Sequence, residues 1–172
     1  MTGWHLPPCP PVAFRGTATS CTAIAGLTNV RSIKIPGVPA DPDAAEQRVG
    51  RLRALVPPHV TIGVSGDTYA ATGLNAGCDV WYSVTGGLFP RAALAIARAA
   101  QSGRRDEAVR LSDRLEPIWA LFRRYGSLRV VAAAATHLGL VGHPNLPLPL
   151  LPLDDAARRQ LVEAIEQANL AT

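Results

Sequence analysis

Lys34 is the only lysine in the sequence, and it stands between Ile33 and Ile35 at the end of a short apolar segment. A lysine that points into an apolar interior loses the hydration of its ammonium group, so its pKa falls. The neutral amine can then attack a carbonyl carbon and form a Schiff base. The alternative is a strand-end lysine whose amine extends into water and performs no chemistry.

Two further groups of polar residues accompany apolar segments of the same kind. Ser65, Gly66 and Asp67 follow one segment, and Tyr82 and Ser83 lie at the end of another. Ligands gather at the carboxyl ends of parallel strands, so these hydroxyl and carboxylate groups are candidates for ligand contacts. The alternatives are structural, because a strand tyrosine commonly packs and an aspartate commonly caps a helix.

The cysteines and histidines indicate neither a metal centre nor a disulfide framework. The three cysteines form no Cys-x-x-Cys pair, and their odd number favours a reducing compartment, so we expect a cytoplasmic protein. His5 and Cys9 are the nearest approach to a metal-binding pair, but prolines interrupt that stretch and helical spacing has little meaning there. Cys21 has no neighbouring base that would activate its thiol.

The composition argues against several classes of function. The chain has 172 residues, of which 48% are hydrophobic and 17% charged, as in an ordinary globular domain. The net charge of +4 comes from dispersed arginines and only 5% of residues are aromatic, so we expect no nucleic-acid partner. A basic scaffold for nucleic acid, the alternative, would show salt-dependent binding to DNA. Since no apolar run reaches the roughly 18 residues of a membrane span, we expect no membrane partner.

The predicted elements alternate after an irregular start. Prolines and small polar residues predict an irregular, proline-rich leader over residues 1–22. Residues 23–103 then follow a β-α-β-α-β pattern, which is typical of a parallel sheet with crossover helices. The expected strands are 29–35, 59–64 and 79–84. Of the helices between them, the first is capped at residues 41–43, with the proline in its first turn, and runs to about Leu55; the second is 68–75. None of these helices opens with a dinucleotide-binding fingerprint or a P-loop.

The region 104–172 is predicted to be helical, following a helix that begins at Pro90. Acidic residues in the first turn start a long helix that we expect to kink at Pro117. The segment Leu128–Leu140 is nearly all apolar and predicts a helix buried between others. A connector rich in proline and leucine leads to a last amphipathic helix capped by Asp154.

Three segments resemble, in order, consecutive strands of one enzyme family. Leu27–Lys34, Gly63–Asp67 and Gly73–Val84 resemble the sixth, seventh and eighth strands of the dihydrodipicolinate synthase / N-acetylneuraminate lyase family, whose sixth strand ends in a Schiff-base lysine. Gly139-Leu140 and Pro147–Pro152 resemble the family's C-terminal helical extension. The resemblance covers about residues 24–170. Members of this family are pyruvate-dependent class I aldolases with a TIM-barrel fold.

The resemblance implies an α/β fold: a partial TIM (β/α)₈ barrel, strands six to eight with their helices, followed by the helical extension. It implies a lyase or aldolase in which Lys34 forms an imine with pyruvate or another small 2-oxo acid. No metal or organic cofactor is implied beyond that covalent imine. Ser65, Gly66, Asp67, Tyr82 and Ser83 would line the substrate pocket, and a homo-oligomer is expected.

The sequence departs from the family pattern before Lys34. Family members have five βα units ahead of this lysine, and their glycine-rich loop, Thr-Thr pair and tyrosine proton relay have no counterpart here. Three strands cannot close a barrel, so an uncovered face and open edges are expected. We therefore expect a truncated or mis-started member whose open parts are covered by self-association or a partner. The alternative is a catalytically inactive remnant or an interaction module of the same fold.

Overall fold

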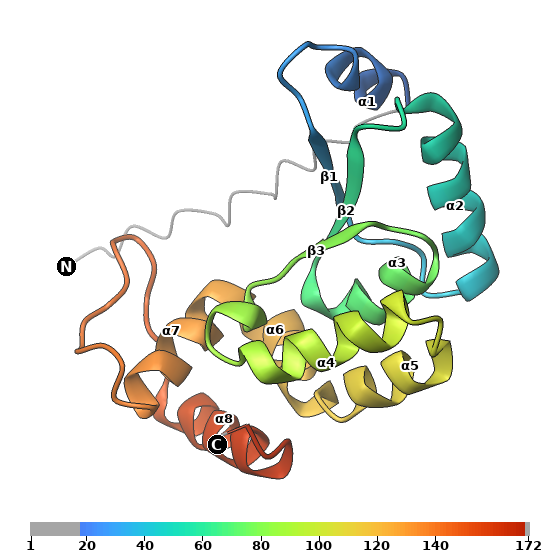
Figure 1. Ribbon diagram of the computed structural model, residues 1–172. Coiled ribbons are helices and arrows are strands. Elements are labelled where there is room, and N and C mark those ends of the chain that lie inside the picture. Colours follow the sequence, from blue (N-terminus) through green and yellow to red (C-terminus); the bar gives the residue numbers. More distant parts are fainter. Residues whose placement is uncertain (1–17, 171–172) are drawn as a thin grey trace.

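The computed structural model describes residues 18–170, which form three short parallel strands and a larger number of helices (Figure 1). The elements are α1 (Ala18–Ala25), β1 (Ser32–Pro36), α2 (Pro42–Leu55), β2 (Thr61–Ser65), the 3₁₀ turn η1 (Asp67–Tyr69), α3 (Ala70–Asn75), β3 (Val80–Tyr82), the 3₁₀ turn η2 (Thr85–Gly87), α4 (Pro90–Gln101), α5 (Arg105–Asp113), α6 (Glu116–Tyr125), α7 (Ser127–His137) and α8 (Asp155–Gln167).

The sheet has the predicted parallel topology, in the order β1-β2-β3. In the register of the first pair, Ser32 faces Thr61 and Lys34 faces Gly63. In the second pair, Gly63 faces Val80 and Ser65 faces Tyr82. Helices α2 and α3 connect consecutive strands, which confirms the β-α-β-α-β prediction and the α/β fold class.

Local sequence explains where α2 begins and ends. The Asp41 side chain accepts a hydrogen bond from the Ala44 amide at 2.9 Å, and Pro42 in the first turn needs no amide partner. The helix ends at Leu55, and the following Val56 has extended backbone. Pro57 and Pro58 then prevent the helix from continuing.

One face of the sheet is covered and the other is not. Ile33, Ile35, Ile62 and Val64 are buried in one apolar cluster with residues of α2 such as Val49. Side chains alternate along strands, so the next residues lie on the opposite side. We call this side the open face; it carries Ser32, Lys34, Pro36, Thr61, Gly63, Ser65, Val80 and Tyr82.

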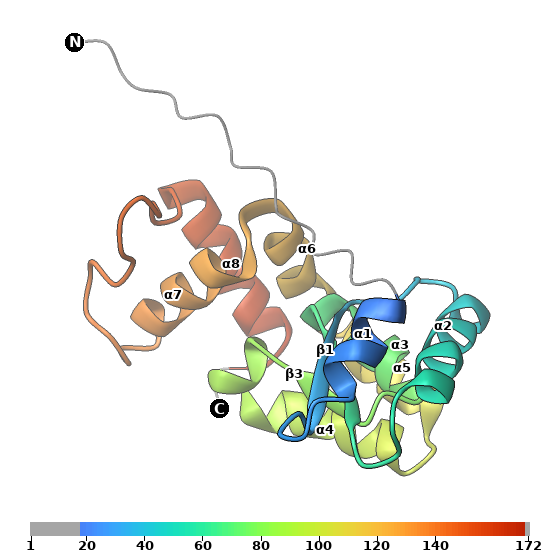
Figure 2. The ribbon, with the colours of Figure 1, turned by 90° about the horizontal axis from the view of Figure 1, so that it is seen from above.

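A second apolar cluster holds the C-terminal helices together. Its largest fully buried side chain is Trp119 of α6, and the cluster also includes Ile96 of α4 and Leu161 and Ile165 of α8. Trp81 of β3 packs against both clusters and so joins the sheet to the helices. Figure 2 shows α6, α7 and α8 gathered on one side of the molecule, away from α1 and α2.

Two helical predictions are corrected by the structure. The expected kink at Pro117 is a break, because α5 ends at Asp113 and Pro117 lies in the first turn of a separate helix, α6. Proline lacks an amide donor and therefore fits the first turn of a helix better than its interior. The apolar segment Leu128–Leu140 is not enclosed: α7 ends at His137, and Leu128 and Leu140 are 55% and 62% exposed.

The predicted leader ends inside a helix. Ala18–Ala25 form α1, which contacts α2, so residues 18–22 are helical rather than irregular. The proline-rich stretch with His5 and Cys9 lies outside the described residues. Within residues 18–170, no helix is both long and apolar enough to cross a membrane.

Close packing of α3 on β2 can be tested at Gly73. A Cβ atom at Gly73 would lie 2.7 Å from Val64 Cγ2, so Gly73→Ala is expected to destabilise the fold by about 1–3 kcal/mol through overpacking. Gly50→Ala in α2 is the matched control, because nothing lies within 4 Å of a Cβ there and alanine favours helix by about 1 kcal/mol. Urea unfolding measures both; a Gly73→Ala chain as stable as Gly50→Ala would contradict this packing.

Candidate functional site

Lys34 lies in the middle of β1 on the open face, beside Gly63 of β2. Its neighbours Ile33 and Ile35 are buried on the covered face, as the alternation of a strand requires. The Lys34 side chain itself is exposed. The described residues therefore place Lys34 in the middle of its strand rather than at its end, and without the burial expected from the sequence.

The aromatic ring of Tyr82 lies close to the Lys34 amine. The Lys34 Nζ atom lies over the Tyr82 ring, 5.9 Å from the ring centroid. The Tyr82 hydroxyl and Ser32 Oγ share a hydrogen bond of 2.6 Å, in which either group can donate. The structure thus brings together two candidate site residues from separate segments of the sequence, Lys34 of β1 and Tyr82 of β3.

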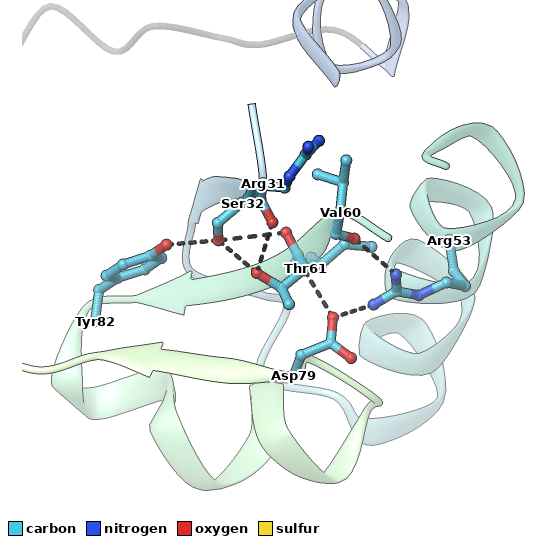
Figure 3. A network of polar contacts seen from close by, with 8 residues as sticks. Arg31, Ser32, Arg53, Val60, Thr61, Asp79 and Tyr82 are labelled. Atoms are coloured by element: carbon cyan, nitrogen blue, oxygen red, sulfur yellow. Dashed lines mark hydrogen bonds and ion pairs between the residues drawn. The ribbon is translucent and has the colours of Figure 1, made fainter. Parts of the chain in front are cut away.

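A network of polar contacts continues from this hydrogen bond across the starts of the strands (Figure 3). Thr61 Oγ1 donates to Ser32 Oγ at 2.7 Å, which links β2 to β1. Asp79, just before β3, accepts a hydrogen bond from the Ile62 amide at 2.7 Å and forms an ion pair with Arg53 of α2. The network fixes both neighbours of β2, so it supports the sheet on which Lys34 lies.

The carboxyl edge of the sheet is formed by two turns and one aromatic ring. Ser65 Oγ donates to the Ile35 carbonyl at 2.9 Å, and the Gly37 amide donates to the Ser65 carbonyl at 2.9 Å. Gly37 and Gly66 have positive φ angles of 57° and 85°, and a Cβ on either would meet the Tyr69 ring. Tyr69 was not predicted from the sequence; its only signal is a position two residues after the Gly66-Asp67 turn.

Asp67 lies inside the protein, beneath the carboxyl edge. The residue is 4% exposed, and its carboxylate accepts hydrogen bonds from Trp81 Nε1 at 2.9 Å and from the Thr85 amide and hydroxyl at 2.7 Å each. The Val84 amide adds a further donor at 3.1 Å. These contacts fix the turn after β3, which agrees with the structural alternative for Asp67. Its contact with a substrate stays a prediction.

Ser83 and the other polar candidates occupy the same edge in different settings. Ser83 Oγ accepts a hydrogen bond from the Gly86 amide at 2.8 Å, within the turn that follows β3. Ser65 and Gly66 lie at the end of β2, beside the turn after β1. In the part of the chain that the structure describes, no group of three or more His, Cys, Asp or Glu side chains is placed to hold a metal ion.

The cavity of about 540 Å³ among the C-terminal helices is separate from this site. It is lined by residues of α4 and α5 such as Ala95 and Leu111 and by the segments that follow α7 and α8, and Lys34 is not among them. The candidate site is therefore a surface on the sheet, centred on Lys34 and Tyr82, rather than an enclosed pocket.

Cys78 is a buried thiol between α3 and β3, adjacent in sequence to Asp79 of the network. Burial, with a smaller contribution from the charge of Asp79, raises the pKa of Cys78 to about 11, although Arg53 and Arg48 act in the opposite direction. The thiol therefore stays protonated at neutral pH and is a poor nucleophile. Cys21, the other cysteine in the described residues, is also free of a disulfide bond.

Comparisons with known proteins agree on one family. The sequence model of the dihydrodipicolinate synthetase family matches residues 20–168. The 4-hydroxy-tetrahydrodipicolinate synthase of Gluconacetobacter diazotrophicus is 35% identical over 97 residues, which are 56% of this chain and 32% of that protein.

Solved structures agree with the sequence comparison. Dihydrodipicolinate synthase of Agrobacterium tumefaciens strain C58 superposes with a TM-score of 0.82 and 41% identity over 88% of this chain and 50% of its own. A dihydrodipicolinate synthase of Acinetobacter baumannii, solved in complex with pyruvate, shares the fold with a TM-score of 0.76 at 20% identity, over 90% of this chain and 50% of its own. This chain thus spans about half the length of these solved relatives.

The structural part of Asp67 can be measured by substitution. Asp67→Ala removes the acceptor of several buried donors, so the free energy of unfolding is expected to fall by about 3 kcal/mol. Asp41→Ala is the matched control, since it removes an exposed cap of α2 and is expected to cost about 1 kcal/mol. Equal losses in urea unfolding would show that the Asp67 network contributes no more than a surface cap.

The buried Cys78 thiol predicts a loss of stability at alkaline pH. The unfolded thiol ionises near its ordinary pKa of 9.0, whereas the folded thiol ionises only near 11, so stability falls as pH rises between these values. The difference in stability between wild type and Cys78→Ala is therefore expected to change over this interval and to be constant below it. A difference that stays constant from neutral pH to pH 11 would contradict the burial of this thiol.

Proposed function

The chain belongs to the dihydrodipicolinate synthetase family, and from this premise we propose that Lys34 is a Schiff-base residue of class I lyase or aldolase chemistry. The substrate would be pyruvate or another small 2-oxo acid. The observation that carries the proposal is the position of Lys34, the only lysine of the chain, in the middle of β1 on the open face of the sheet. The pyruvate in the Acinetobacter baumannii structure supports this choice of ligand.

The proposed chemistry needs no metal and no organic cofactor. The unprotonated Nζ of Lys34 attacks the carbonyl carbon of the 2-oxo acid, and loss of water from the adduct leaves an imine. Protonation of the imine nitrogen makes it an electron sink. Removal of a proton from the adjacent carbon then gives an enamine, whose carbon can bond to an aldehyde; the reverse sequence cleaves the same bond.

The exposed position of Lys34 defines what the rest of a site must supply. An ordinary lysine is protonated at neutral pH, and burial is the usual means of favouring the free amine. The described residues leave the open face uncovered, so a closed pocket requires further protein on this face. We propose that a homo-oligomer provides it, and that Ser65, Gly66, Asp67, Tyr82 and Ser83 form this chain's part of the pocket.

The proposal includes the cytoplasmic location that the cysteine content favours. The activity of a whole family member is likewise a proposal for this chain, since about half the length of its solved relatives is represented here.

Imine formation can be tested by trapping. Pyruvate and borohydride are added to the full chain, and the intact mass of the product is recorded. The product is then digested, and a peptide map locates the adduct. One reduced pyruvyl group is expected on the peptide that contains Lys34, because no other lysine is present. The peptide map distinguishes this adduct from one on the α-amino group of the chain. Lys34→Arg is the matched control: it retains the positive charge but has no amine that forms the adduct.

Thermal melts of the wild type and of Lys34→Arg serve as the folding control, and both are expected to show the same transition. A folded wild-type chain that gains no adduct at Lys34, even at pyruvate concentrations well above those of cells, would overturn the proposal. That result would support the alternative of an inactive remnant or an interaction module with the same fold.

A further inference from the structure

The Tyr82 side chain does not stand upright on the sheet but lies back across β2. Tyr82 ends β3 and pairs with Ser65, yet its ring lies against Gly63, two residues earlier along β2. A Cβ atom at Gly63 would be 2.2 Å from Tyr82 Cε2 and 2.7 Å from Tyr82 Cδ2. The ring, together with Val80 Cγ2 at 2.7 Å, therefore occupies the space that any other residue at position 63 would fill.

The far end of the ring is anchored to the first strand. The Tyr82 hydroxyl bonds to Ser32 Oγ at 2.6 Å, and Ser32 Oγ also accepts from Thr61 Oγ1 at 2.7 Å (Figure 3). The side chain thus begins on β3, crosses β2 and ends on β1. An aromatic ring held at both ends has little freedom to rotate away, although its position is 39% exposed.

The same ring lies beneath the amine of Lys34. Gly63, which the ring covers, is the register partner of Lys34, and Nζ lies over the ring at 5.9 Å from its centroid. The face of an aromatic ring carries partial negative charge and attracts a cation at about this distance. Both the ammonium of Lys34 and a protonated imine on the same nitrogen carry positive charge.

We propose that Tyr82 is a positioning residue for Lys34: its ring, seated on Gly63 and anchored to Ser32, supports the amine from the sheet side and stabilises positive charge on the nitrogen. The geometric part of this inference stands on the contacts above. The chemical part rests on the proposed function, because it concerns the imine. With the ring on the sheet side, a 2-oxo acid must approach Nζ from the side away from the strands.

The geometric part can be tested without any activity. Protein grown with ¹³C-lysine gives one ε-methylene signal, because Lys34 is the only lysine. In the wild type, the ring current of Tyr82 is expected to shift this proton signal away from the free-lysine value. Tyr82→Phe retains the ring and is expected to keep most of the shift, whereas Tyr82→Leu is expected to lose it.

Gly63→Ala is a second, independent variant. It retains both Lys34 and Tyr82 but adds a Cβ atom where the ring lies, so the ring must move and the shift is expected to disappear. Thermal melts identify variants that do not fold. A folded Tyr82→Leu chain with the same ε-methylene shift as the wild type would overturn the proposal.

The chemical part is measured by the pyruvate concentration that gives half-maximal borohydride trapping at Lys34. This concentration is expected to rise about two- to fivefold in Tyr82→Leu, because the nitrogen is no longer held in one position, and to stay near the wild-type value in Tyr82→Phe, which retains the ring face. If the wild type shows the shift but no trapping, the proposed function fails and the position of Tyr82 stands. If trapping is the same in wild type and Tyr82→Leu, the effect of Tyr82 on imine formation is overturned while the proposed function stands.

Discussion

The pairing of Lys34 with Gly63 in neighbouring parallel strands is the constraint on which the site depends. A shift of this register by one residue would move Lys34 to the covered face and expose its isoleucine neighbours, which the apolar cluster with α2 opposes. The same pairing places the amine beside a residue with no side chain. Tyr82 can lie across the sheet only because that space is empty.

Two carboxylates, exposed Asp79 and buried Asp67, maintain this arrangement from either end of the strands. Asp79 joins β2 to α2 at the amino end through the Ile62 amide and Arg53. Asp67 joins Trp81 to the turn after β3 at the carboxyl end. Trp81 also packs against both apolar clusters, so the position of β3, and with it Tyr82, depends on the C-terminal helices as well as on the sheet.

Much of this framework could be predicted from the sequence, because it depends on residues that are close together in the chain. Branched residues and prolines located the strands and α2, and the resemblance identified the strand that carries Lys34. Contacts between distant residues could not be predicted in this way. Tyr82 bonds to a residue 50 positions away, and nothing near it in the sequence indicates that its ring lies flat. The exposure of Lys34 is equally non-local, since burial depends on what covers the open face. The break at Pro117 was misjudged because proline fits both a kink and a first turn.

The most direct test of the account is a crystal structure of the chain after treatment with pyruvate and borohydride. The account predicts continuous density from Lys34 Nζ to one pyruvyl carbon, with the Tyr82 ring beneath the nitrogen and against Gly63. An unmodified Lys34 amine in a chain that otherwise has this fold would contradict the assignment of Schiff-base chemistry to this residue.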